Sequence, residues 1–143
     1  MKRQQYSTAM EAATVAGGAE LVRLRDSIND VEVSVMPSFG NAAVKMMVQG
    51  KIILHFPSSK ESQEGKKMGG IPLLAPWANR LDHSGFWADG RDYALQMKPG
   101  NFKVDANGLP IHGLLWNQPW EVAGIQADEA SASVTSRFEF SSH

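Results

Sequence analysis

Residues 130–140 read ASASVTSRFEF, and this stretch shows the clearest periodicity in the chain. Its small and apolar side chains share one face: Ala130, Ala132, Val134, Phe138 and Phe140. Because successive side chains of a strand point to opposite faces, such alternation predicts a strand with one buried and one wet face. Residues 120–123 (WEVA) are predicted to form the preceding strand, with a turn around Gly124 and residues 127–129.

The same period of two recurs upstream. Residues 31–35 (VEVSV) predict a strand, and Gly50 separates two further runs, residues 44–48 and 51–56. The second run, KIILHF, is continuously apolar, which predicts a more buried strand. Asp89-Gly90, between residues 86–88 and 91–95, predicts a β-hairpin, because both central positions of a tight turn need a positive φ. No stretch has a convincing helical period, so the predicted class is all-β with antiparallel sheets.

Composition narrows the function. The 143 residues carry 14 basic and 15 acidic side chains, so no excess of positive charge is available for a nucleic acid or an anionic membrane. The absence of cysteine excludes disulfides, thiolate zinc sites and cysteine nucleophiles. Residues 1–20 are expected to form a flexible tail and residues 21–143 a single domain.

Targeting signals are not evident. Glu11 interrupts the Ala-rich stretch in which the apolar part of a signal peptide would lie. No run approaches the roughly 18 apolar residues of a membrane span. The cytoplasm is therefore the expected compartment by default.

Residues 69–120 concentrate the side chains that suit a sugar ligand. All four tryptophans lie there, together with His83 and His112. An indole face packs against the C–H patches of a pyranose, and polar side chains bind its hydroxyls. The alternative is that the tryptophans fill the core of a β-sandwich.

Five segments of the chain, in this order, resemble the motifs of the aldose 1-epimerase (galactose mutarotase) family. They are residues 70–81 (GIPLLAPWANRL), 85–86 (GF), 89–95 (DGRDYAL), 110–114 (PIHGL) and 120–122 (WEV). Each is weak alone, but the ordered set spans about residues 21–140.

The resemblance implies an antiparallel β-sandwich of the galactose mutarotase-like type, of which this chain supplies the N-terminal half. It also implies a carbohydrate isomerase that interconverts the α and β anomers of a free aldohexose, such as galactose or glucose, by acid/base ring opening. By the same resemblance, Asn79 and Arg80 bind sugar hydroxyls, and His112 is the first active-site histidine, binding and polarising the sugar near its ring oxygen. No cofactor or metal is expected, because only protons move.

Each of these residues also has a structural alternative. Arg80 could pair with Asp82 or another surface carboxylate, Asn79 could cap a turn, and His112 could be a structural histidine. Trp77 is expected to pack in the core. His83 and His55 match no family motif and are expected to be surface or structural residues.

The chain also departs from the family pattern. In the family, a later segment contributes a second histidine, in a Gly-x-His-Pro context, and the glutamate base. Glu121, Asp128 and Glu139 match no motif and are not substitutes for that base. The chain is therefore expected to be either the first half of a longer reading frame or a truncated relative. An incomplete sandwich is expected to self-associate through exposed strand edges.

Three other functions stay open. A site that keeps the sugar-binding residues Asn79, Arg80 and His112 (here called the sugar clamp) but has no base fits a non-catalytic carbohydrate-binding module. A hexose-6-phosphate 1-epimerase is a second alternative, although residues 76–80 (PWANR) resemble the free-aldose branch more closely. A purely structural β domain, which would neither bind nor convert sugar, is the third.

Overall fold

The computed structural model describes residues 4–12, 19–56, 68–96 and 102–140. These residues form eleven strands and no helix, and every pair of neighbouring strands is antiparallel, which confirms the all-β prediction. In this described part, no helix is long and apolar enough to cross a membrane. The chain divides into two compact units. Unit 1 combines Met1–Pro72 with Asn117–Glu139, and unit 2 combines Leu73–Trp116 with Phe140–His143.

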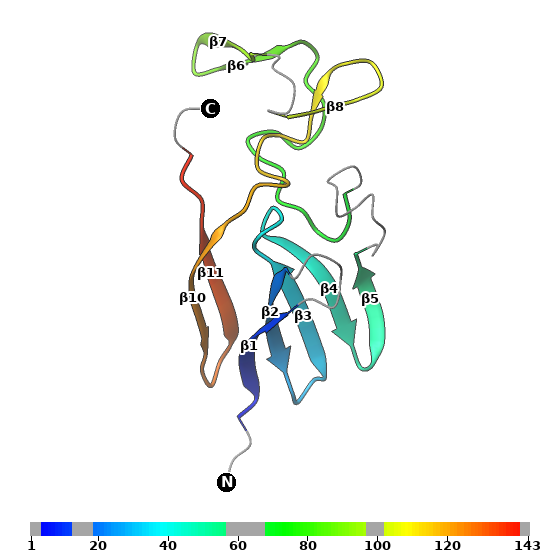
Figure 1. Cartoon of the computed structure of the whole chain (residues 1–143), viewed down its shortest axis with the longest axis vertical. Coiled ribbons are helices and arrows are strands. Elements are labelled where there is room, and N and C mark those ends of the chain that lie inside the picture. The colour runs from blue at the N-terminus through cyan, green and yellow to red at the C-terminus, as the bar shows by residue number, and fades with distance from the viewer. Residues whose placement is uncertain (1–3, 13–18, 57–67, 97–101, 141–143) are drawn as a thin grey trace. The chain divides into compact units, whose positions relative to one another are not determined.

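Unit 1 contains a five-stranded antiparallel meander (Figure 1). Its strands lie side by side in chain order: β1 (Tyr6–Ala12), β2 (Glu20–Asp26), β3 (Val31–Met36), β4 (Ala42–Val48) and β5 (Lys51–His55). β3 and β4 form where the alternation predicted strands. β1 lies within the segment expected to be a flexible tail, yet it pairs with β2 from Tyr6 opposite Asp26 to Ala12 opposite Glu20. Its sequence, YSTAMEA, combines Tyr6 and Thr8, which favour strands, with alanine and glutamate, which do not, so pairing with β2 decides that this segment is a strand.

The prediction that residues 51–56 form a more buried strand is wrong for most of β5. Ile52 and Ile53 are 61% and 62% exposed. β5 is the last strand of the meander, and within the described part of the chain β4 is the one strand it pairs with, so its side chains lie at the edge of the sheet. Phe56, immediately after the strand, is buried. A continuous apolar run therefore did not distinguish a central strand from an edge strand here.

A second hairpin completes unit 1. β10 (Glu121–Ala127) pairs with β11 (Ala132–Arg137), and the hairpin contacts β1 and β2 (Figure 1). Both strands were predicted, but the expectation that Gly124 lies in the turn is wrong. Gly124 lies within β10 and pairs with Thr135, and the strand register shifts between Val122 and Gly124. Asp128 stabilises its turn, because Oδ1 accepts hydrogen bonds from the backbone N–H groups of Ala130 at 2.7 Å and Ser131 at 2.8 Å. These two hydrogen bonds lower the pKa of the Asp128 carboxyl below its ordinary value, and the bond from Ala130 has the larger effect.

The apolar core of unit 1 lies at one end of the meander. Four buried side chains form it, with three half-buried ones packed against them: Met36, Ala42, Val44 and Phe56, then Ala19, Leu21 and Phe39. Phe39 and Phe56 meet edge to face, with ring centroids 5.9 Å apart. Val22 on β2 is fully buried.

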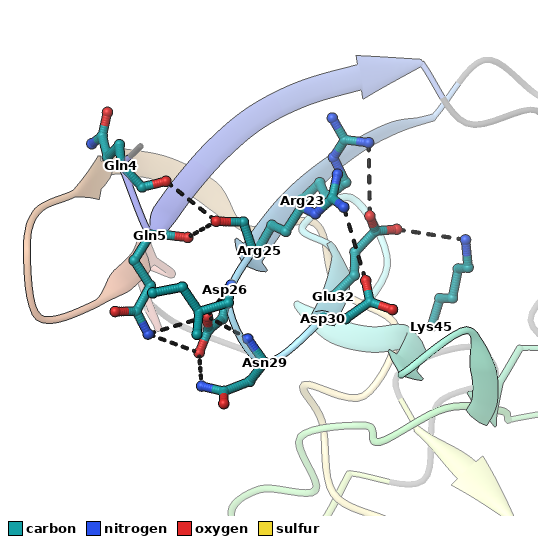
Figure 2. Close-up of polar contacts among 11 residues, drawn as sticks. Gln4, Gln5, Arg23, Arg25, Asp26, Asn29, Asp30, Glu32 and Lys45 are labelled. Atoms are coloured by element: carbon teal, nitrogen blue, oxygen red, sulfur yellow. Dashed lines mark hydrogen bonds and ion pairs between the residues drawn. The ribbon is translucent and has the colours of Figure 1, made fainter. Parts of the chain in front are cut away.

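Charged side chains cross the meander in a network (Figure 2). Arg23 contacts Glu11 at 2.8 Å and Glu32 at 3.8 Å, and Lys45 contacts Glu32 at 3.6 Å. In the β2–β3 turn, Asp26 Oδ1 accepts hydrogen bonds from the backbone N–H groups of Ile28 and Asn29 (Figure 2). The Asn29 side chain, 2.6 Å from Asp26 Oδ2, is the main cause of the lowered pKa of Asp26. Each carboxylate is already paired, which is typical of a solvated sheet face.

Unit 2 consists of two short hairpins and connecting segments. β6 (Gly85–Ala88) pairs with β7 (Arg91–Ala94), and β8 (Lys103–Val104) pairs with β9 (Pro110–Ile111). Between β6 and β7, Asp89 and Gly90 have φ angles of 49° and 75°, which confirms the hairpin predicted from this pair. Aromatic rings pack on the β6–β7 hairpin. Phe86 stacks on Tyr93 with ring centroids 5.3 Å apart, and the ring centroids of Trp77 and Phe86 lie 6.2 Å apart.

Candidate functional site

The three side chains expected to contact sugar lie on two neighbouring segments of unit 2. The backbone N–H of His112 donates to the carbonyl oxygen of Asn79 at 3.2 Å, and Arg80 forms an antiparallel bridge with Ile111. Leu81 N–H donates to the carbonyl oxygen of Pro110 at 2.9 Å. The structure therefore brings Asn79 and Arg80 next to His112, although more than 30 residues separate them in the sequence.

The imidazole of His112 is held in a defined tautomer. Its Nδ1 lies 3.0 Å from the carbonyl oxygen of Ala78. Because a carbonyl oxygen only accepts, Nδ1 must carry a hydrogen. On the neutral ring, Nε2 is then an acceptor, and it has no partner among the described residues. Such a nitrogen can accept a hydrogen bond from a hydroxyl group or, when protonated, donate one to an ether oxygen.

The backbone around His112 has an unusual conformation. His112 and Gly113 have φ angles of 70° and 72°, in the left-handed region that residues other than glycine rarely adopt. Gly113 lies against Ala75: the two form a parallel bridge, and a Cβ on Gly113 would overlap the Ala75 carbonyl group. The same carbonyl accepts a hydrogen bond from Leu114 N–H at 2.7 Å. Glycine after His112 is therefore required by close backbone packing, and it fixes the path of the chain beside the imidazole.

Arg80 is paired on one side of its guanidinium. Its Nε donates to Oδ2 of Asp105 at 2.8 Å. The Arg80 side chain is 53% exposed, whereas that of Asp105 is 8% exposed. The two Nη groups of Arg80 have no partner within the described part of the chain. The expected alternative partner, Asp82, instead lies 3.7 Å from Nε2 of His83 in an exposed pair.

Asp105 is a member of this site that the sequence reasoning did not identify. Its Oδ1 accepts hydrogen bonds from the backbone N–H groups of Asn107 at 2.8 Å and Leu109 at 3.0 Å. The Leu109 N–H, followed by the Arg80 guanidinium and the Asn107 N–H, lowers the pKa of the Asp105 carboxyl. The available signal was the Asp-Ala-Asn-Gly tetrapeptide, residues 105–108, in which an aspartate typically caps its own turn.

Asn79 forms a local backbone contact, as its structural alternative predicts. Its Oδ1 accepts a hydrogen bond from the backbone N–H of Arg80 at 2.9 Å, so the side chain stabilises its own segment. Its Nδ2 has no partner in the described ranges, and the residue is exposed. The amide can therefore still donate to a ligand oxygen.

The tryptophans of unit 2 differ in their surroundings. Trp116 is 4% exposed, with Nζ of Lys103 5.4 Å from its ring centroid. Trp77 is half-buried against Phe86, in keeping with the expected packing role, and its Nε1 has no hydrogen-bond partner among the described residues. Trp87 is 69% exposed.

An open cavity of about 570 Å³ lies at the β6–β7 hairpin, lined by residues 81–87 and 92–94. It does not include Asn79, Arg80 or His112. Among the described residues, no three histidine, aspartate or glutamate side chains gather in a way that would hold a metal ion.

Comparisons with known proteins identify a family and, separately, a fold. The family model described as aldose 1-epimerase matches residues 9–142. The chain is also similar to the crystal structure of a galactose mutarotase-like protein from Clostridium acetobutylicum, with a TM-score of 0.74 and 22% sequence identity. That match covers 97% of this chain and 40% of the other chain, so this chain spans well under half of that protein. No curated protein matches. The likeness confirms the expected galactose mutarotase-like fold.

Proposed function

Because the chain belongs to the aldose 1-epimerase family, we propose that it binds a free aldohexose and contributes to the interconversion of its α and β anomers. The observation that carries the proposal is the juxtaposition of Asn79, Arg80 and His112 on two adjacent backbone segments. Three sets of their polar atoms have no partner among the residues that the structure describes: Nδ2 of Asn79, the Nη groups of Arg80 and Nε2 of His112. A pyranose presents hydroxyl and ring oxygens that match this set.

The proposed chemistry is ring opening and closure. A base removes the proton of the anomeric hydroxyl while an acid protonates the ring oxygen, and the bond between the anomeric carbon and the ring oxygen breaks. The resulting aldehyde rotates and is attacked on its other face, with both proton transfers reversed. Asn79 and Arg80 would hold hydroxyls, and Nε2 of His112 would polarise the sugar near the ring oxygen.

We propose further that this chain supplies the sugar clamp and lacks the family's base. The contacts of the candidate carboxylates support this. Glu121 Oε2 lies 2.9 Å from Nη2 of Arg137, and Asp128 caps the β10–β11 turn. Asp105, the carboxylate bonded to the clamp, is occupied by Arg80 and two backbone N–H groups. The same contacts favour the second candidate function, a non-catalytic carbohydrate-binding module.

Polarimetry of freshly dissolved α-D-galactose and α-D-glucose, together with a binding titration, tests these proposals. Acceleration of mutarotation that is lost in His112→Ala and kept in His83→Ala would support the isomerase. His83 is a matched control because it is 87% exposed and is not bonded to the Asn79, Arg80 and His112 segments. Binding without acceleration would support the binding module. Tighter binding of glucose 6-phosphate than of glucose would indicate a hexose-6-phosphate 1-epimerase, and neither binding nor acceleration would contradict all three.

We also propose that the chain self-associates through β5, the edge strand with two exposed isoleucines. An edge strand has unpaired backbone N–H and C=O groups, and antiparallel pairing with β5 of a second copy would satisfy them. Pairing centred on Ile53 would place Ile52 opposite Leu54 of the second copy, which buries apolar side chains against one another. The cytoplasm stays the expected compartment.

A further inference from the structure

We propose that Asp105 is a positioning residue, which holds the guanidinium of Arg80 in place to receive a sugar. This inference rests on the proposed sugar-binding function. It concerns a residue outside the segments that resemble family motifs.

Comparison with Asp128 separates this role from turn capping. Asp128 uses Oδ1 to accept two backbone N–H groups in a hairpin turn, as Asp105 does between β8 and β9. Asp26 caps its turn in the same way, and its Oδ2 accepts hydrogen bonds from the neutral side chains of Gln5 and Asn29. At Asp105 the second oxygen, Oδ2, accepts a hydrogen bond from an arginine that lies 25 residues away in the sequence. The turn needs only Oδ1, so the arginine contact is an additional function of this carboxylate.

The geometry of the contact leaves the ligand-binding part of Arg80 available. Asp105 occupies the single N–H of Nε, and the four N–H groups of Nη1 and Nη2 stay unpaired in the described part of the chain. A long side chain that is about half exposed would otherwise sample many rotamers, and ligand binding would have to restrict them. The Asp105 side chain is 8% exposed, and both of its oxygens accept hydrogen bonds, so it provides a fixed anchor. An aspartate is already charged near neutral pH, and the lowered pKa of Asp105 extends that charged range toward acid.

The anchor is also connected to His112. The backbone of Asp105 exchanges hydrogen bonds with its turn: its N–H donates to the Leu109 carbonyl at 2.9 Å, and its carbonyl accepts from Gly108 N–H at 3.0 Å. Val104 and Pro110 pair across the same turn, and β9 leads directly to His112. Asp105 therefore sets the position of Arg80 relative to β9, the strand directly before His112.

Asp105→Asn in the full chain tests the proposal. Asparagine keeps the oxygen that accepts the turn N–H groups, but it replaces Oδ2 with an NH₂ group, which places a donor against the Nε donor of Arg80. We expect the Kd for D-galactose to rise roughly tenfold, since hydrogen bonds to charged groups are the stronger class. Asp128→Asn, the same change in the β10–β11 turn, is the matched control and should leave the Kd unchanged.

Arg80→Lys distinguishes positioning from a general structural role. Lysine keeps the charge but has no Nε–H for Asp105 to hold. If Asp105 acts through Arg80, adding Asp105→Asn to Arg80→Lys should cause little further loss of affinity. If Asp105→Asn lowers the affinity for galactose tenfold both in the parent chain and in Arg80→Lys, its role is structural and the proposal is overturned.

NMR of the unmutated chain gives a measurement that does not depend on a variant folding. We expect slow hydrogen exchange at Nε of Arg80 before sugar is added, and sugar-induced changes at the Nη signals. Fast exchange at Nε, or an unchanged Kd in Asp105→Asn when the parent chain binds galactose, would overturn the positioning role and leave the proposed function standing. No binding of any aldose by the parent chain would overturn both.

Discussion

Gly113→Ala is expected to destabilise unit 2 by about 3 kcal/mol, and the structure allows that magnitude to be divided into causes. The φ angle of 72° places this residue in the left-handed region, which costs an alanine about 1 kcal/mol or more. The added Cβ would overlap the carbonyl of Ala75, so one of the two backbone segments must move. That movement would also weaken the hydrogen bond of 2.7 Å from Leu114 N–H to the same carbonyl. Overpacking and a weakened hydrogen bond together account for about 2 kcal/mol more.

Gly90→Ala is the matched control. Gly90 has nearly the same φ angle, 75°, but an added Cβ meets no atom within 4 Å. This substitution should lower the free energy of unfolding only by the cost of placing alanine at a positive φ, about 1 kcal/mol. Urea unfolding followed by tryptophan fluorescence measures both variants, since three of the four tryptophans lie in unit 2. Equal losses of unfolding free energy in the two variants would refute the close-packing argument.

Three further predictions follow from the structure. The pKa values of Asp26, Asp105 and Asp128 are lowered by hydrogen bonds they accept in the folded state, so their stabilising effect is complete above the ordinary value of 3.8 and is lost as the pH falls through the folded values. Urea unfolding between about pH 5 and pH 2, where carboxyl groups titrate, should show that the free energy of unfolding falls as the pH falls. The fall should be less steep in an Asp128→Asn chain, and equal pH slopes in the two chains would contradict this. His112→Gly should be more stable than His112→Ala by about 1 kcal/mol, because the backbone at 112 has a φ of 70°, and thermal unfolding that ranks alanine above glycine would be inconsistent with that conformation. Ile53→Lys should lower the average mass in sedimentation, because a charge on the β5 edge opposes strand pairing, and an unchanged mass would exclude β5 as the interface.

The candidate site was predictable from the sequence only in part. The motif match selected Asn79, Arg80 and His112, and the structure places them on adjacent segments. It did not select Asp105, because an aspartate in an Asp-Ala-Asn-Gly turn is fully explained by local capping. That the second carboxylate oxygen contacts an arginine 25 residues away is a tertiary fact with no local signal.

Local sequence determined the strands that carry a period of two, and it determined the β6–β7 turn. Residues 31–35 and the stretch that becomes β11 alternate, and Asp89-Gly90 permits the positive φ angles of a tight hairpin. These features depend on side-chain direction and backbone sterics, which act over a few residues.

Only the tertiary structure decided which strands are central and which are edges. Ile52 and Ile53 have the same local pattern as a buried strand, but no strand pairs on the outer side of β5 in the described meander. β1, whose local sequence does not alternate between apolar and polar residues, forms because β2 supplies its hydrogen-bond partners. The physical reason is the same in both cases: burial and strand pairing depend on residues far away in the chain, and local propensity does not contain that information.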